Sequence, residues 1–529
     1  MLSSSVNQSE PLVDAPVGLI EGVSQQNLNV FKGIPYAEAP VNELRWRPPV
    51  PKKPWNSIRK ATEFGPSCVQ PSNKIENIYT ADIRPTSEDC LSLNIWAPKN
   101  ANKAAIFVWI HGGALVKGSS KEPMYDGANL ANTGIVVVSI NYRLGVLGFL
   151  AHPELSAEST NGISGNYGLL DQIEALRWIK QNIESFGGDP NNITVAGESA
   201  GALSAMYLMA SPLARGLFNK VITQSAYMIS APTLKESRFG EFPAETVGEY
   251  IGKKVDAINL DELRQLDPQT LVEKAAASGY FPQPTIDGHV VPRQLVETFE
   301  RGEQAPVPIL AGFNSGEIRS LTVLAPKAPL SSKEYIDIIE ERYGDLSSTF
   351  LELYPAIDLQ ESIYATTRDA LYGWTAERLA RMQTAIGQPA YLYLFDHPYE
   401  ATEKYNLHAF HASEIPYIFG NFDRTPKLWP KNPHTKEEFQ FSKAMMDYWS
   451  HFAKANIPSA DGYDVWKEYG EERMYMSFEE QPILSKGVFP GMFELHEESV
   501  CRRRATNQMQ WNWNVGIISP VLTDDDMCQ

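Results

Sequence analysis

The sequence has little cysteine: four of its 529 residues are cysteines. None of them forms a C-x-x-C pair, so the sequence lacks the spacing typical of zinc and thiol redox sites. We therefore expect no metal and no cofactor. Cys68 and Cys90 enclose a polar loop, residues 69–89, of the kind that a disulfide holds closed in an oxidising compartment. Two free thiols in a cytoplasmic enzyme fit the same pattern nearly as well.

Positive charge and long apolar runs are also scarce. The chain has 46 Lys and Arg against 64 Asp and Glu, a net charge of −18, and no basic stripe with aromatic residues, which argues against nucleic-acid binding. The longest strongly apolar runs, such as residues 135–138, are far too short to cross a bilayer, so we expect no membrane span. No intact secretion signal is visible. Residues 1–15, rich in Ser, Asn and Gln, are expected to form a flexible arm.

The chain has no internal repeat, no low-complexity tract and no linker long enough to divide it. A length of 529 residues alone suggests two or more domains, but large α/β enzymes often break that rule. We expect one domain, residues 1–529, with large insertions. Residues 230–304 are more polar and have a helical pattern, and we expect them to form an insertion over the sheet edge where substrates enter.

What the sequence does contain is an alternation of short apolar strands with helical or loop segments. This alternation predicts an α/β fold with a mostly parallel, helix-covered sheet. An amphipathic pattern over residues 169–183 predicts the crossover helix that such a sheet needs, and a second helix is expected over residues 438–455. The predicted strands are residues 105–110, 135–140, 193–196, 220–223, 307–313 and 390–395.

The most informative stretch is Gly197-Glu198-Ser199-Ala200-Gly201, a G-x-S-x-G motif between an apolar strand and an apolar helix. This is the setting of a nucleophile elbow, in which a serine stands on a sharp strand-to-helix turn and the two glycines let the backbones pass close together. A turn serine that only caps a helix is the alternative. The flanking strand and helix favour the elbow, so Ser199 is the candidate nucleophile.

A serine hydroxyl needs a base within hydrogen-bond reach and a carboxylate that orients this base. In the α/β-hydrolase order both follow the serine, with the acid first. His408 and His411, which follow the strand predicted at residues 390–395, are equal candidates for the base. Glu317 follows another predicted strand, at the end where α/β active sites form, and Asp396 is the competing acid. The residue patterns leave both choices open.

A glycine-rich loop follows the strand predicted at residues 105–110. Its sequence, His111-Gly112-Gly113-Ala114, is HGGG-like, and such loops donate backbone N–H groups to the oxyanion of an acyl-transfer reaction. An ordinary Gly-Gly turn is the alternative. The N–H of Ala200, next to the candidate nucleophile, would be a further donor.

These motifs and several further blocks resemble the type-B carboxylesterase/cholinesterase family of α/β-hydrolases. The resemblance covers roughly residue 16 to the helix predicted at residues 438–455, and the blocks together are highly specific. The further blocks are Phe31-Lys32-Gly33-Ile34-Pro35-Tyr36-Ala37, Ser87-Glu88-Asp89-Cys90-Leu91-Ser92-Leu93-Asn94-Ile95, Asn141-Tyr142-Arg143-Leu144-Gly145 and Phe186-Gly187-Gly188-Asp189-Pro190.

The resemblance implies a choice of acid and base. The family's acid is the glutamate of a G-x-N-x-x-E segment, which matches residues 312–317. Its histidine precedes a stretch like residues 412–420. The resemblance therefore implies a catalytic triad of Ser199, Glu317 and His411.

The resemblance also implies an oxyanion hole and a disulfide. The family's oxyanion donors match Gly113, Ala114 and Ala200, and its first disulfide matches Cys68 and Cys90. The third glycine of the family is replaced by Ala114, which keeps the N–H but adds a methyl group beside the acyl oxygen.

A second departure concerns choline esters. Cholinesterases carry a tryptophan for the quaternary ammonium group in the loop between the first cysteine pair, and residues 69–89 contain none. Cation–π capture of choline therefore loses its best partner, and Tyr79 is a weak substitute.

The sequence therefore predicts a serine carboxylesterase that hydrolyses neutral carboxylic esters through an acyl-enzyme intermediate. The alternatives are a lipase acting on longer-chain acylglycerols, disfavoured because no amphipathic lid is obvious, and a non-catalytic cholinesterase-like interaction protein, disfavoured because all three triad residues are present. We expect small-molecule ester substrates and a monomer or homodimer. A bridge between Cys68 and Cys90 would indicate a secreted or periplasmic protein, and free thiols a cytoplasmic one.

Overall fold

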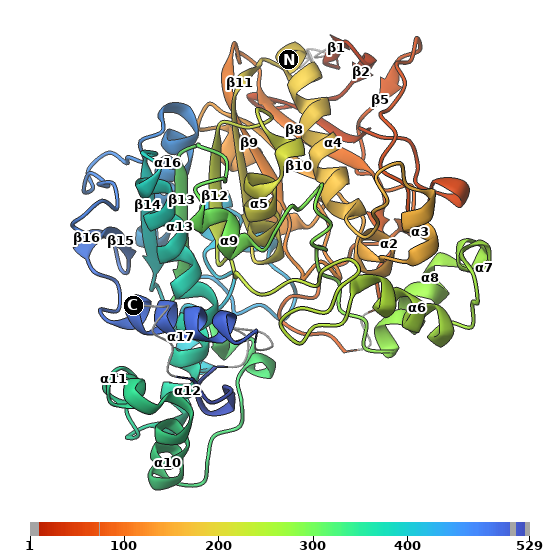
Figure 1. Cartoon of the computed structure of the whole chain (residues 1–529). Coiled ribbons are helices and arrows are strands. Elements are labelled where there is room, and N and C mark those ends of the chain that lie inside the picture. Colours follow the sequence, from red (N-terminus) through yellow and green to blue (C-terminus); the bar gives the residue numbers. More distant parts are fainter. Residues whose placement is uncertain (1–9, 73–74, 508–514, 524–529) are drawn as a thin grey trace.

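The computed structural model describes residues 10–72, 75–507 and 515–523. Its centre is an 11-stranded sheet covered by helices (Figure 1). The strands of this sheet are β3 (Val23–Gln25), β4 (Leu28–Pro35), β8 (Ser92–Pro98), β9 (Ala104–Ile110), β10 (Val136–Ile140), β11 (Gly188–Glu198), β12 (Lys220–Gln224), β13 (Ile309–Asn314), β14 (Ala390–Phe395), β15 (Met474–Phe478) and β16 (Pro482–Lys486). Their order is β16-β15-β14-β13-β12-β11-β9-β10-β8-β4-β3.

The pairs between β15 and β10 are parallel, and the pairs at both edges are antiparallel. The structure thus confirms the predicted α/β fold with a mostly parallel sheet. Because the strands are parallel, their carboxyl ends lie at one edge, where the loops after β9, β11, β13 and β14 meet. These are the loops that carry the candidate site residues.

Each central strand is buried on both faces, as expected for a parallel sheet between helices. In β9, Ile106, Val108 and Ile110 belong to one apolar core, and Phe107 and Trp109 belong to the opposite core. Successive side chains of a strand point to opposite faces, so one apolar run fills both cores. The first core contains α4 (Tyr167–Asn182), α5 (Ala200–Ala210) and α13 (Trp374–Ala385), and the second contains α15 (Ile415–Phe419) and α16 (Lys436–Ala455).

The remaining helices lie around these two layers, and two groups extend away from the sheet (Figure 1). Helices α6, α7 and α8 share a small apolar core with α2, and α10, α11 and α12 share another with α17. The bounds are α1 (Ala128–Ala131), α2 (Gly145–Phe149), α3 (Pro153–Glu158), α6 (Ala244–Lys254), α7 (Leu260–Gln265), α8 (Pro268–Ala277), α9 (Leu295–Glu300), α10 (Ser332–Tyr343), α11 (Ser347–Leu353), α12 (Leu359–Arg368), α14 (Glu400–Lys404) and α17 (Met492–Ala505).

Most predicted elements agree with the structure to within two residues, including both predicted helices, which are α4 and α16. The exception is β11, which begins at Gly188 although its apolar run begins only at Ile193. Gly188 pairs with Ala104 of β9, and the register shifts before Ile193. The Gly-Asp-Pro-Asn sequence of this segment indicates a turn. It nevertheless begins a strand, because the neighbouring strand β9 pairs with Gly188.

The predicted N-terminal arm is only partly outside the fold. Residues 12–15 form β1 (Leu12–Ala15), which pairs antiparallel with β2 (Gly18–Glu21) in a small sheet with β5 (Arg59–Lys60). The expectation of a flexible arm is wrong for these residues, since the pairing fixes them. The rest of the prediction falls on residues 1–9, which lie outside the described residues. In the described part of the chain no helix has both the length and the apolar composition needed to span a bilayer.

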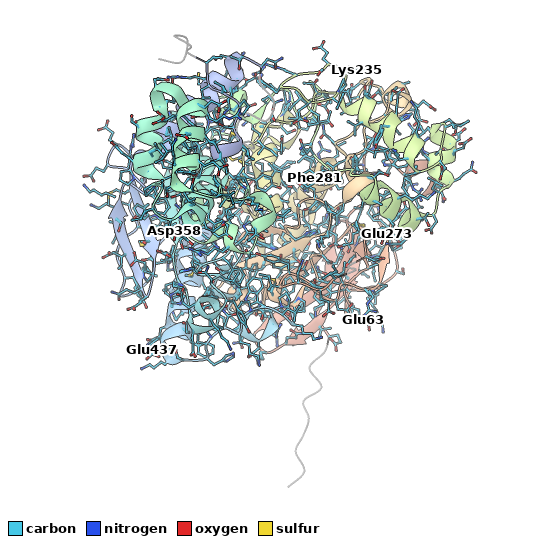
Figure 2. The ribbon with its side chains drawn as sticks, turned by 90° about the horizontal axis from the view of Figure 1, so that it is seen from below. Glu63, Lys235, Glu273, Phe281, Asp358 and Glu437 are labelled. Carbon is cyan, nitrogen blue, oxygen red and sulfur yellow. A yellow bond between two sulfur atoms is a disulfide. The ribbon has the colours of Figure 1, made fainter. Side chains whose placement is uncertain are left out.

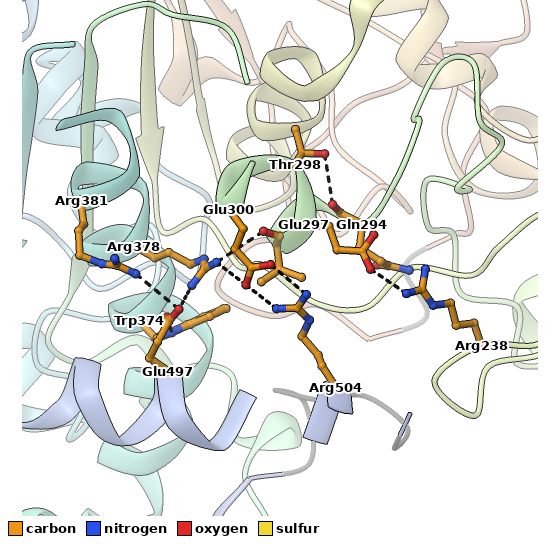
Figure 3. A network of polar contacts seen from close by, with 11 residues as sticks. Arg238, Gln294, Glu297, Thr298, Glu300, Trp374, Arg378, Arg381, Glu497 and Arg504 are labelled. Carbon is orange, nitrogen blue, oxygen red and sulfur yellow. Dashed lines mark hydrogen bonds and ion pairs between the residues drawn. The ribbon is translucent and has the colours of Figure 1, made fainter. Parts of the chain in front are cut away.

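An ion-pair network joins three helices far apart in the sequence (Figure 3). Arg378 of α13 has no exposed side-chain surface and contacts Glu497 of α17 and Glu300 of α9. Trp374 Nε1 donates to Glu497 at 2.8 Å, and Arg504 of α17 contacts Glu300. A buried arginine that is paired with carboxylates of two other helices ties these helices to its own. This network fixes α13, whose N-terminal extension reaches the candidate site.

Cys68 and Cys90 form a disulfide, with their Cα atoms 5.0 Å apart. The bridge closes a loop with a sequence separation of 22 residues. Part of this loop lines the candidate active site, described below. The bridge therefore holds one wall of that cavity to the sheet.

We expect the Cys68→Ala/Cys90→Ala variant to lose about 3 kcal/mol of stability, because an open loop of this length gains chain entropy on unfolding. Equilibrium unfolding in denaturant measures the loss. A parallel titration of the unfolded wild type under non-reducing conditions should find both thiols blocked. Free thiols at Cys68 and Cys90, or an unchanged unfolding midpoint in the variant, would contradict the prediction.

Candidate active site

Ser199 stands on the turn between β11 and α5, as the elbow motif predicts. Its backbone has φ 55° and ψ −119°, a conformation that costs a serine of order 1–3 kcal/mol. The turn is possible because the residues two positions before and two positions after Ser199 are glycines. A Cβ on Gly201 would lie 2.0 Å from the Ile110 carbonyl oxygen, and one on Gly197 would lie 2.4 Å from the Gly201 backbone. The close passage of β9, β11 and α5 forces the serine side chain outward at the sheet edge.

Glu317 and His411 come from loops that follow different strands and lie in hydrogen-bond contact. His411 Nδ1 donates to Glu317 Oε2 at 2.5 Å, and Glu317 Oε1 accepts from the backbone N–H of Asn314 at 2.8 Å. The two loops are joined by a hydrogen bond from the Gly316 N–H to Ala409 O. Glu317 is fully buried and His411 is 5% exposed. Hydrogen bonds therefore hold the carboxylate and anchor the imidazole through Nδ1, and Nε2 is left for another partner.

The partner nearest to Nε2 in this structure is Glu198, the residue before the serine. Glu198 Oε1 lies 3.0 Å from His411 Nε2, although the contact lacks the angle of a hydrogen bond. In the described chain no hydrogen bond joins Ser199 Oγ to His411, but both side chains line one cavity. Burial lowers the pKa of His411, and the carboxylates of Glu198 and Glu317 outweigh burial and raise it well above its usual value.

The competing candidates lie elsewhere. His408 is partly exposed, with Nδ1 3.1 Å from Glu403 and Nε2 3.1 Å from the Asn406 side chain. Asp396 accepts a hydrogen bond from Ser315 Oγ at 2.5 Å. Neither residue lines the cavity that contains Ser199. Of the two candidate bases, only His411 lines this cavity. Of the two candidate acids, only Glu317 contacts His411.

The glycine-rich loop after β9 lines the same cavity. Gly113 and Ala114 have positive φ values of 104° and 56°, and neither N–H donates a hydrogen bond to another group of the described residues. The Ala200 N–H lies in the first turn of α5, where a helix provides no acceptor. Gly113 and Ala114 line the cavity that also contains Ser199, and Ala200 directly follows the serine. The three N–H groups are therefore candidates for oxyanion donors.

His111 supports this loop, a contact that the sequence patterns did not reveal. Its Nδ1 donates to Gly112 O at 2.9 Å, and its ring stacks on Tyr142 with a centroid distance of 4.6 Å. Tyr142 OH donates in turn to His111 O at 2.9 Å. Burial lowers the pKa of His111 to about 4, so the ring is neutral at pH 7. His111 is thus a structural member of the loop.

Two further buried carboxyl groups lie near the site and were also missed. Burial, followed by the charge of Glu198, raises the pKa of Glu414 to about 8, and its oxygens accept hydrogen bonds from Gln224 and Asn314. Burial raises the pKa of Glu122 to about 7, and this residue lines the cavity. These groups come from segments nearly 300 residues apart, so no local pattern in the sequence could indicate their approach.

The cavity has a volume of about 450 Å³ and is walled largely by tyrosine and aliphatic side chains. Tyr372 lies 5.3 Å from the His411 ring, centroid to centroid, and belongs to a π-helical segment, Asp369–Gly373, at the start of α13. Tyr79 OH lies 3.0 Å from His411 O and 2.7 Å from Ser320 Oγ. Tyr79 therefore holds the histidine loop. Among the described residues no group of three or more His, Cys, Asp and Glu could hold a metal ion.

A mostly parallel sheet with a strained serine after a central strand, and with an acid–histidine pair after later strands, defines an α/β-hydrolase. The model of the carboxylesterase family matches residues 9–491. The chain therefore belongs to the carboxylesterase family and is a carboxylic ester hydrolase. This confirms the family resemblance stated from the motifs.

Relatives with known names and structures agree with this assignment. The chain is 36% identical to the para-nitrobenzyl esterase of Bacillus subtilis (87% of this chain and 93% of that protein) and 35% identical to the fumonisin B1 esterase of Sphingopyxis macrogoltabida (89% and 87%). A solved para-nitrobenzyl esterase structure has a TM-score of 0.79 and 31% identity over 92% of this chain and 99% of that one. A carboxylesterase structure from Geobacillus stearothermophilus has a TM-score of 0.76 and 32% identity, with the same coverage.

Proposed function

We propose that the protein is a serine carboxylesterase in which Ser199 is the nucleophile, His411 the general base and Glu317 the residue that orients His411. The observation that carries the proposal is the buried hydrogen bond between Glu317 and His411, because His411 lines the same cavity as Ser199 at the elbow. A serine at an elbow without such a pair would have no base to activate it.

The reaction follows from these positions. His411 Nε2 takes the proton of Ser199 as its oxygen attacks the ester carbonyl, and the N–H groups of Gly113, Ala114 and Ala200 stabilise the oxyanion. His411 then gives the proton to the leaving alcohol, and water attacks the acyl-enzyme by the same route. Before the first step the imidazole must turn from Glu198 toward Ser199, since Nε2 faces Glu198 in this structure.

Neutral carboxylic esters fit the cavity best. Its walls are mainly tyrosine and aliphatic groups, and the loop of residues 69–89 offers Tyr79 but no tryptophan to a quaternary ammonium group. The name of the Bacillus subtilis relative, a para-nitrobenzyl esterase, points to the same class of small uncharged ester. The lipase alternative is not favoured, because the named relatives above are esterases.

Labelling with diisopropyl fluorophosphate tests the nucleophile. We expect one equivalent of label on Ser199, found by peptide mapping, with complete loss of p-nitrophenyl acetate hydrolysis. Ser225 is a suitable control, since it is a buried serine after the neighbouring strand β12 whose hydroxyl has no partner. The Ser225→Ala variant should react like the wild type. Label on any residue other than Ser199 would overturn the proposal.

The pH dependence of kcat/KM should reveal the effect of the two carboxylates beside His411 on its pKa. The base works only when neutral, so kcat/KM should rise with pH through a His411 pKa that both carboxylates raise. The Glu198→Gln variant removes one of these charges and should shift the rising limb to lower pH by roughly one unit. The matched control is Glu403→Gln, which removes the carboxylate beside His408. If the rise of kcat/KM in Glu198→Gln occurred at the same pH as in the wild type, or at a higher pH, the expected role of Glu198 would be wrong.

We also propose that residues 1–529 form one domain, since both large cores pack on a single sheet. A monomer or homodimer without nucleic-acid partners fits the acidic net charge of −18. The Cys68–Cys90 disulfide supports a secreted or periplasmic location, because such bridges persist in oxidising compartments.

A further inference from the structure

A second cavity of about 400 Å³ lies beside the catalytic one. It is formed by residues 229–232, by α6 and by the segment of residues 278–285. Phe281 lines both cavities, and Figure 2 shows its position near the middle of the face seen from below. None of the chemistry proposed above uses this second cavity.

The wall between the two cavities is built from residues that are close together in the sequence. Tyr227 lines the catalytic cavity, and Ile229 and Ser230, two and three residues later, line the second one. Phe281 completes the wall from the opposite segment and is 49% exposed. A substrate chain too long for the catalytic cavity would therefore meet this wall first, and the half-exposed ring of Phe281 is its least enclosed part.

The mouth of the second cavity is unusually aromatic. The described residues include five aromatic side chains with large exposed surfaces, and three of them line this cavity: Phe242 (71% exposed), Tyr250 (48%) and Phe281 (49%). Exposed apolar groups that gather in one concave place mark a binding site, whereas scattered ones carry no such meaning. The ligand should accordingly present an apolar chain.

We propose that the second cavity binds the far end of an extended ester substrate, an apolar chain that passes Phe281. This inference rests on the proposed function of the catalytic cavity and specifies its substrate class. The chain can belong to the acyl group or to the alcohol, and the experiment distinguishes these two sources.

The test fills the second cavity without changing a residue that lines the catalytic one. Val247 of α6 lines only the second cavity, and Glu249, exposed on the same helix, lines neither. We expect Val247→Trp to keep kcat/KM for p-nitrophenyl acetate within twofold. The same variant should lose at least tenfold for p-nitrophenyl dodecanoate if the acyl chain enters the cavity, or for dodecyl acetate if the alcohol does. Glu249→Trp should behave like the wild type with all three esters, each used below its micelle concentration.

Long esters cleaved equally well by wild type and Val247→Trp would overturn the inference while leaving the proposed function intact. A wild type that cleaves no ester, short or long, would instead refute the proposed function.

Discussion

Replacing His411 by alanine is expected to lower kcat for p-nitrophenyl acetate by roughly 10³-fold or more, because Ser199 then has no group to take its proton. Ser199→Ala and Glu317→Ala should have losses of the same order. The three residues act as a unit, so the Ser199→Ala/His411→Ala double variant should be no slower than the single variants. Steady-state kinetics on variants with wild-type circular dichroism spectra measures these losses.

The competing residues provide matched controls for this prediction. His408→Ala removes a histidine three residues away that contacts Glu403 and Asn406, and it should keep most of the activity. Asp396→Asn should also be tolerated, since this carboxylate bonds Ser315 and lies outside the cavity. If His408→Ala lost most of the activity while His411→Ala stayed active, the base would be His408. If Asp396→Asn lost most of the activity while Glu317→Ala stayed active, the acid would be Asp396.

Gly201→Ala is expected to destabilise the protein by about 3 kcal/mol and to abolish most of the activity. The added Cβ would lie 2.0 Å from the Ile110 carbonyl oxygen, and both groups belong to rigid elements, α5 and β9. Relief of this clash must move α5 away from the sheet, which also displaces Ser199 and the Ala200 N–H. Denaturant unfolding and ester hydrolysis, measured on the same preparation, report the two effects.

Gly252→Ala is the control for the loss of a helical glycine. Gly252 lies in α6, and a Cβ there would have its nearest neighbour, the Ala257 carbonyl oxygen, at 3.2 Å. The gain of about 0.5–1 kcal/mol from replacing a helical glycine should offset this tighter contact, so the variant should be close to wild type. If Gly201→Ala unfolded at the same denaturant concentration as Gly252→Ala, the close passage of α5 over β9 would not be a constraint.

The carboxyl groups around His411 differ in their contacts. Glu198 and Glu317 face the imidazole directly, whereas Glu414 is held by two amide groups and has its pKa raised to about 8. At pH 7 the protonated form of Glu414 therefore predominates, which spares the site one further negative charge.

Local sequence determined the elements that carry the site. Apolar runs bounded by Gly, Pro and Asn fixed β9 and β14 to within one residue, because burial on both faces of a parallel strand leaves a continuous apolar signature. The elbow could also be predicted from local sequence. Its two glycines are needed for steric reasons at that turn, and they flank the serine between a strand and a helix. The family pattern then indicated Glu317 and His411, a choice that the residue types by themselves left open.

Only the tertiary structure decided which groups face one another across the sheet edge. The start of β11 at Gly188 and the pairing of residues 12–15 depend on neighbouring strands, which override the turn and arm signals of their own sequences. The contact of Glu198 with His411 joins residues more than 200 positions apart, and the second cavity arises from α6 and Phe281 meeting beside the catalytic wall. Such contacts depend on the packing of whole elements, which no single stretch of sequence encodes, and they decide the charge of the base and the space open to the substrate.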